Sequence, residues 1–225
     1  MILSIAAIQD PVVIARLQDG LAGLSWRDGR STAGSAASAV KRNEQAVMND
    51  TAGVKMRDLL VPIIAENPVV KAAARPRRIS SPMIARTPVG GYYGAHVDNA
   101  MMGAGNARMR SDISFTLFLT DPENYEGGEL IVHAAGMTQT IKGKAGEMIL
   151  YPSTSIHEVR PVTNGARVVC VGWIESMICD PAHRELLFDL ENLRATLRQT
   201  RPAGSAEMLT LDKTIANLLR MWGQS

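Results

Sequence analysis

The 225-residue sequence has only two cysteines, Cys170 and Cys179, too far apart to form a Cys-x-x-Cys redox or zinc pair. A chain of this length buries enough apolar surface to fold without disulfides or a structural metal. Disulfides persist mainly in oxidising compartments. We therefore expect two reduced thiols and a cytoplasmic protein.

The sequence also lacks an excess of charge of either sign and a long hydrophobic run. Lys and Arg number 24 against 22 Asp and Glu, so the broad basic surface of a nucleic-acid binder is not expected. The apolar residues 1–8 have no basic segment before them, and Gln9-Asp10-Pro11 interrupts them well short of a membrane span. The sequence predicts no nucleic-acid partner, no membrane segment and no export signal.

The first third of the chain shows a helical period. Asp10 and Pro11 match the N-cap and the first position of a helix with an apolar face. A second helical pattern covers about residues 53–74, and a short third helix is predicted after Pro68. Between these helices, residues 27–39 are mostly small or glycine, which favours a loop. This loop is either a lid over a substrate or an exposed connection.

Beyond Pro76, short β-prone runs alternate with turn residues, as in a sandwich or barrel. The runs cover residues 78–87, 112–120, 128–133, 137–141, 147–151, 157–161 and 167–174. Within residues 113–119 the odd-numbered positions are all large and apolar and share one face. Helices followed by antiparallel strands predict an α+β fold around a double sheet.

After residue 180 the helical period returns. Leucines recur at steps of four, three and four, and the pattern repeats after a Pro-Ala-Gly break at residues 202–204. We divide the chain into a domain over residues 1–177, with helices over 10–74 and a β core over 77–176, and a helical hairpin over 178–225. The hairpin packs against the β core or forms a homo-oligomer interface through residues 181–222.

Two of the four histidines have neighbours that suggest a metal site. His96 and Asp98 are separated by one residue, so they project from the same face of an extended segment. His157 comes 59 residues after Asp98, at the start of a later predicted strand. Two imidazoles and one carboxylate on one side of a metal form the facial triad that suits non-haem Fe(II). Its open coordination positions are what oxygen chemistry requires.

Arg167 follows His157 by ten residues, where the chain should have turned and returned along a neighbouring strand. A guanidinium group is planar and permanently charged, so it can bind a carboxylate through two parallel hydrogen bonds. We expect Arg167 to bind the distal carboxylate of a 2-oxoacid whose other end chelates the iron.

The whole arrangement resembles the Fe(II)- and 2-oxoglutarate-dependent dioxygenases, and more closely the bacterial PKHD-type hydroxylases of the prolyl-4-hydroxylase-like superfamily. The resemblance runs over nearly the full chain. Segments that look like family blocks, in family order, are residues 41–45, 93–98, 110–114, 117–119, 125–130, 146–153, 165–168 and 186–190.

The resemblance implies a distorted double-stranded β-helix of the jelly-roll or cupin type. It implies Fe(II) bound by His96, Asp98 and His157, 2-oxoglutarate held by Arg167, O2 as oxidant and L-ascorbate as a reductant that rescues over-oxidised iron. The implied reaction is hydroxylation of an unactivated C–H bond, with decarboxylation of 2-oxoglutarate to succinate and CO2. The substrate is peptidyl, a free amino acid or a small metabolite.

Related enzymes often carry a tyrosine on the strand corresponding to residues 116–120, where it shares the distal carboxylate with the basic residue. This chain has Phe118 or a threonine there. Tyr93 and Tyr151 are candidates to contact the cofactor or substrate, or to pack beside the ligands. His133 and His183 lack a suitably spaced partner and are predicted to lie outside the metal site.

Two other classes of function stay open. One is a cupin-like protein that uses the same ligands for Zn(II) or Ni(II), as a hydrolase or isomerase. The other is a non-catalytic sensor of iron or 2-oxoglutarate whose C-terminal helices bind a partner. A metal hydrolase has no need of a dicarboxylate anchor such as Arg167, and a sensor would not turn over.

Overall fold

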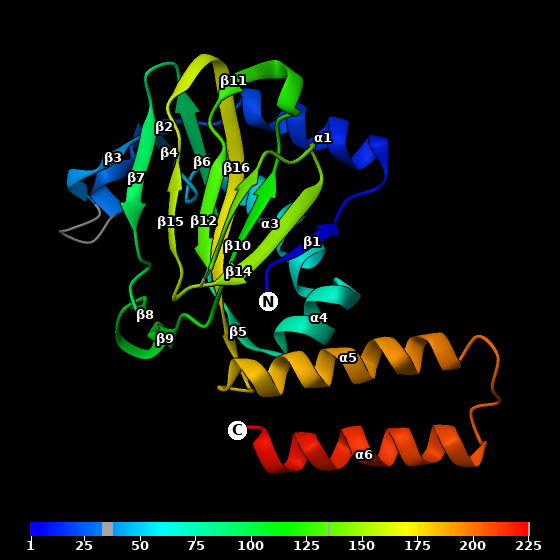
Figure 1. Ribbon diagram of the computed structural model, residues 1–225. Helices are drawn as coiled ribbons and strands as arrows, with labels where there is room; N and C mark the ends of the chain where they lie inside the picture. Colours follow the sequence, from blue (N-terminus) through cyan, green and yellow to red (C-terminus); the bar gives the residue numbers. More distant parts are fainter. Residues whose placement is uncertain (33–37, 135, 225) are drawn as a thin grey trace.

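The computed structural model describes residues 1–32, 38–134 and 136–224, and two antiparallel sheets face each other in it (Figure 1). The larger sheet has the order β1 (Leu3–Ala6), β14 (Glu147–Pro152), β10 (Ile113–Phe118), β16 (Val162–Ser176), β6 (Met83–Pro88), β4 (Glu44–Ala46) and β2 (Trp26–Asp28). β11 (Tyr125–Gly127) and β5 (Pro76–Ile79) also pair with β16. The smaller sheet has the order β13 (Met137–Ile141), β12 (Leu130–Ala134), β15 (Ile156–Val159), β7 (Tyr92–His96) and β3 (Lys41–Arg42). The predicted α+β fold around a double sheet is confirmed.

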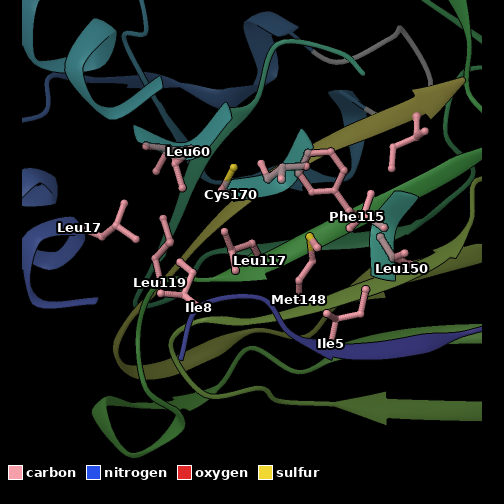
Figure 2. Close-up of a cluster of buried hydrophobic side chains, with 14 of the residues drawn as sticks. Ile5, Ile8, Leu17, Leu60, Phe115, Leu117, Leu119, Met148, Leu150 and Cys170 are labelled. Carbon is pink, nitrogen blue, oxygen red and sulfur yellow. The ribbon is translucent and has the colours of Figure 1, made fainter. Parts of the chain in front are cut away.

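Three helices cover the outer face of the larger sheet: α1 (Pro11–Ala22), α3 (Thr51–Ala65) and α4 (Pro68–Ala74). Each begins at a side chain that caps its free backbone N–H groups, namely Asp10, Asp50 and Asn67. Leu17 of α1 and Leu60 of α3 pack into one apolar core with Phe115 and Leu117 of β10 (Figure 2). The helices thus hold the larger sheet from outside and leave its inner face to the space between the sheets.

Strand β10 shows how the sequence separates these two environments. The odd-numbered residues Phe115 and Leu117 join the core under the helices. Phe118 joins a second core between the two sheets, and Ser114 and Thr116 line a pocket there. The alternation predicted from the sequence is confirmed, and it places hydroxyl groups inside the sandwich.

Truncation of one core side chain tests how much the core under the helices contributes to the free energy of unfolding. Leu60 is fully buried, whereas its neighbour Val61 is 42% exposed. We expect Leu60→Ala to lower the free energy of unfolding by about 2–5 kcal/mol, because it removes buried methyl groups and leaves a cavity. The matched Val61→Ala should change it by less than about 0.5 kcal/mol. Urea denaturation measures both, and equal effects would contradict the packing described.

The prediction of a loop over residues 27–39 was partly wrong. Residues Trp26–Asp28 form β2, which pairs with β4, and Gly29–Thr32 form a 3-10 turn. Strands this short have no detectable period, and their hydrogen bonds come from a neighbouring strand that local sequence does not reveal. The domain division likewise treated residues 10–74 as helical, but β2, β3 and β4 lie among them. Residues 33–37 of the expected lid lie outside the described residues, so the lid stays a prediction.

The C-terminal hairpin is present as predicted, with helices α5 (Pro181–Leu197) and α6 (Ala206–Trp222). α5 lies between α4 and α6 (Figure 1), and an Arg75–Glu191 ion pair ties it to the end of α4. His183, predicted outside the metal site, stacks on Trp222 with ring centroids 3.9 Å apart. A homo-oligomer through residues 181–222 stays a prediction, and a sedimentation mass equal to one chain would contradict it.

Among the helices of the described residues, none combines the length and the apolar character needed to cross a bilayer.

Candidate active site

Two neighbouring strands of the smaller sheet bring the two candidate histidines together. β7 and β15 are antiparallel, and His96 lies directly opposite His157 in their register. The ring centroids are 4.3 Å apart. Asp98 follows the end of β7, with its Oδ2 3.8 Å from His157 Nε2. One ligand atom from each of the three residues lies within 4.8 Å of the others, so the predicted triad is assembled.

Both imidazole rings are oriented by backbone carbonyl groups. His96 Nδ1 lies 2.8 Å from Gly94 O, and His157 Nδ1 lies 3.1 Å from Ser155 O. A carbonyl oxygen can only accept, so each Nδ1–H donates and each Nε2 keeps its lone pair for a metal. The sequence alone did not indicate these contacts, and an acidic neighbour such as Glu158 is not needed for them.

The Asp98 carboxylate is held by one buried serine, which a second buried serine contacts in turn, and the sequence did not single out either. Ser114 Oγ donates to Asp98 Oδ2 at 2.6 Å, and Ser153 Oγ lies 2.7 Å from Ser114 Oγ. Ser114 comes from the inner face of β10, and Ser153 follows β14. The inward position of Ser114 in the alternating strand was the one signal that could have identified it.

The electrostatics of the triad favour a cation. Burial, together with the neighbouring His157, lowers the pKa of His96 to about 4, so its ring is neutral at physiological pH. Two imidazoles and one carboxylate on one side of a centre match the ligand set of non-haem Fe(II). The residues present therefore fit the metal that the sequence predicted.

Removal of the Ser114 hydroxyl should weaken metal binding without removing a ligand. We expect Ser114→Ala to lower Fe(II) affinity about 10–100-fold, because Asp98 would lose the group that orients it. Ser176→Ala is the control, since Ser176 is fully buried but bonds to Arg75 O and Ile178 N, away from the triad. Anaerobic equilibrium titration with Fe(II) measures both. Unchanged affinity in Ser114→Ala would show that the serine does not hold the ligand.

Arg167 of β16 reaches the same pocket from the larger sheet and is 3% exposed. Its guanidinium lies 5.4 Å from the centre of the Phe118 ring. Its buried Nε has no hydrogen-bond partner among the described residues. A buried cation that keeps an unsatisfied donor is costly, so the site fits a bound carboxylate.

Tyr125 and Gly128 help to place Arg167, and neither was predicted. A Cβ atom at Gly128 would lie 3.2 Å from both Arg167 Cδ and Tyr125 Cε2, so a larger residue would crowd both side chains. Burial raises the pKa of Tyr125, although the positive charge of Arg167 opposes the change. The Tyr125 hydroxyl remains protonated beside the guanidinium.

Tyr93 and Tyr151 both pack against the histidines. Tyr93 stacks on His96 with centroids 3.7 Å apart, and Tyr151 meets the His157 ring edge-on at 5.1 Å. Burial and the negative charge of Asp98 raise the pKa of Tyr93 to about 12, and burial raises the pKa of Tyr151. Both tyrosines line the pocket, and whether either contacts a cofactor stays a prediction.

The pocket between the sheets collects every residue predicted for the site: Tyr93, His96, Asp98, Tyr151, His157 and Arg167. On the strand where a tyrosine was expected in related enzymes, Thr116 lines the pocket and Phe118 packs in the core between the sheets. His133 is exposed on β12, with its Nδ1 3.2 Å from Thr138 Oγ1, and lies outside the site as predicted.

Comparison of the sequence with known families agrees with this geometry. Residues 82–175 match the 2OG-Fe(II) oxygenase superfamily, and residues 182–224 match the PKHD-type hydroxylase C-terminal domain. A PKHD-type hydroxylase of Hyphomonas neptunium is 49% identical over 210 residues, covering 93% of this chain and 94% of that protein. The chain belongs to the PKHD-type hydroxylases. Another, from Synechococcus elongatus, is 44% identical over 224 residues and covers all of both chains.

Solved structures similar to this hydroxylase share its double-stranded β-helix. A Trichoplax adhaerens prolyl hydroxylase in complex with a peptide superposes with a TM-score of 0.59 at 14% identity, covering 78% of this chain and 83% of that one. A 2OG-Fe(II) oxygenase from Burkholderia pseudomallei gives a TM-score of 0.56 at 20% identity, covering 77% and 84%. The fold predicted from the family resemblance is confirmed, and the hydroxylase is an oxidoreductase.

Proposed function

We propose that this hydroxylase uses Fe(II), bound by His96, Asp98 and His157, and 2-oxoglutarate, anchored by Arg167, to hydroxylate an unactivated C–H bond. The observation that carries the proposal is the triad together with, in the same pocket, a buried arginine whose Nε has no hydrogen-bond partner among the described residues. Bound Fe(II), with 2-oxoglutarate and O2, supplies the oxidising power, and succinate and CO2 are the co-products.

The chain itself arranges and protects the reactants. The three ligands lie together on one side of the pocket and would leave the other side of a bound metal open. Arg167 would hold the distal end of the co-substrate through its planar guanidinium. Leu130, Val169 and Val171 form apolar walls that keep bulk water from the site. The serines behind Asp98 hold the carboxylate in place as the reactants enter.

Arg167 favours this reaction over the cupin-like alternative, since a Zn(II) or Ni(II) hydrolase or isomerase would leave a buried guanidinium unexplained. Membership of a hydroxylase family favours it over a non-catalytic sensor. We therefore keep one function and test it by turnover.

The test is succinate formation by the purified protein with 2-oxoglutarate and O2, comparing Fe(II) with Zn(II) and Ni(II). We expect succinate only with Fe(II), and we propose that L-ascorbate prolongs turnover by reducing over-oxidised iron. Turnover with Zn(II), or none with Fe(II) demonstrably bound, would contradict the proposed function. An ascorbate effect no larger than that of another reductant would contradict the ascorbate proposal alone.

The proposed substrate is a peptide, a free amino acid or a small metabolite. All three stay open because proteins of this fold bind substrates of very different size. Among solved structures of this fold, one holds a peptide, and HygX of Streptomyces hygroscopicus holds hygromycin B. Cys170 and Cys179 are both free thiols, which supports the proposal that the hydroxylase works in the reducing cytoplasm.

A further inference from the structure

One charged side chain in the pocket has no role in the reaction proposed above. Lys41 lies on β3 and is only 8% exposed, yet it lines the same pocket as the metal triad. Among the described residues no ion pair and no hydrogen bond engages its ammonium group, whose nitrogen faces the pocket and is not sealed inside the protein. Its close neighbour is the Tyr93 ring, whose centre is 5.0 Å from Lys41 Nζ.

The strand register explains this position. Lys41 lies directly opposite Tyr93 on β7, and Tyr93 stacks on His96. Lys41 is therefore one aromatic ring away from a metal ligand. Gly94 allows the close approach of the segment before β3, because a Cβ there would lie 3.0 Å from Val40 Cβ.

A buried ammonium group without a counterion is unfavourable. Burial lowers the pKa of Lys41 to about 8, although the charges of Asp98 and Asp28 oppose the change. The Asp98 carboxylate is committed to the metal, so it cannot also serve as the partner of Lys41. An anion that entered the pocket would stabilise the charged form of Lys41 and offset the hydration that its ammonium group loses on burial.

The charges in the pocket leave room for such an anion. Arg167 and Lys41 each carry one positive charge and Asp98 one negative charge. Fe(II) and doubly ionised 2-oxoglutarate cancel each other, so one positive charge remains. One carboxylate on the substrate would neutralise it.

Lys41 is also placed on the substrate side of the pocket. It lines a second, wider cavity beside β2 and β4, together with Asn43, whereas Arg167 lines only the inner pocket. Lys41 thus lies where the metal pocket meets this outer cavity. Trp173, which also lines the inner pocket, has a buried Nε1 donor without a hydrogen-bond partner among the described residues.

We propose that Lys41 binds a carboxylate of the substrate, so that the hydroxylated compound is a carboxylate-bearing molecule held beside Tyr93. This rests on the proposed function and narrows its substrate class. Lys41 acts as a specificity-determining residue, and Arg167 remains the anchor of 2-oxoglutarate.

The test uses pairs of probes that differ only in this group: L-glutamate with L-glutamine, L-aspartate with L-asparagine, and N-acetyl-L-amino acids with their amides. Binding is measured by anaerobic calorimetry to the full-length protein loaded with Zn(II) and 2-oxoglutarate, so no turnover is needed. The variants are Lys41→Met, which keeps the length but removes the charge, and Lys41→Arg, which keeps the charge.

For at least one pair we expect the wild type to bind the carboxylate at least about 10-fold more tightly than the amide. Lys41→Met should abolish this preference and Lys41→Arg should retain most of it, while both keep the wild-type affinity for 2-oxoglutarate. If no carboxylate binds the wild type, or if Lys41→Met keeps the preference, the proposal is wrong.

A loss of 2-oxoglutarate affinity in Lys41→Met would instead assign Lys41 to the co-substrate site and also overturn the proposal. Succinate formation by the wild type with Fe(II) is measured in parallel. Its absence would count against the proposed function, whereas the calorimetric result bears on Lys41 alone.

Discussion

Arg167→Met should raise the KM for 2-oxoglutarate at least about 100-fold, corresponding to about 3 kcal/mol. The substitution leaves the distal carboxylate in a buried site without a cation. The wild type should strongly prefer 2-oxoglutarate to 2-oxopentanoate, which has a methyl group in place of that carboxylate. In Arg167→Met this preference should disappear, because neither co-substrate then finds a charge partner. CO2 formation against co-substrate concentration measures both effects, because 2-oxopentanoate gives butanoate in place of succinate.

Arg184→Met is the matched control for this substitution. Arg184 is 7% exposed and also a buried arginine, but its Nη1 donates to the carbonyls of Ile178 and Cys179 beside the C-terminal hairpin. We expect it to lower stability and leave the KM unchanged. If both variants raised the KM alike, the effect would be structural and Arg167 would not be the anchor.

His157→Ala should lower Fe(II) affinity by more than about 100-fold and abolish turnover. Mutation of a group that only orients a metal ligand typically lowers metal affinity by about 10–100-fold. His157→Ala removes a ligand itself, so its effect should be larger. Equilibrium titration of the anaerobic protein with Fe(II) gives the affinity, and succinate formation gives the activity.

His133→Ala provides the comparison, because His133 lies on β12, the strand that pairs with β15, yet is exposed. It should bind Fe(II) as the wild type does. Wild-type Fe(II) affinity in His157→Ala would mean that the metal lies elsewhere, and the triad would have to be abandoned.

The metal triad could be predicted from the sequence because its geometry follows from strand periodicity. His96 and Asp98 share one face of an extended segment, and His157 needed only a neighbouring strand. Apart from the inward position of Ser114, the sequence held no signal for the contacts that orient the triad. Ser153 approaches Ser114 across 39 residues. Of the carbonyls that orient the histidines, that of Gly94 lies within β7 and that of Ser155 in a bend before β15, and neither contact shows in the sequence pattern.

The longer helices and strands could be predicted from the sequence, and the shortest strands could not. β10 and the C-terminal helices have clear periods and were predicted nearly within their bounds. The two- and three-residue strands β2, β3 and β4 depend on pairing with other strands, so none was predicted, and most of β2 was assigned to the loop over residues 27–39. Lys41 was missed as a pocket residue for the same reason, since its burial comes from pairing with Tyr93 on β7.

The most direct test of the account is an anaerobic titration of the Fe(II)-loaded protein with 2-oxoglutarate, followed by admission of O2. We predict a weak visible metal-to-ligand charge-transfer band that decays with formation of succinate and is absent from Asp98→Ala. No band in the wild type with Fe(II) demonstrably bound would contradict the account and favour the cupin-like or sensor alternative.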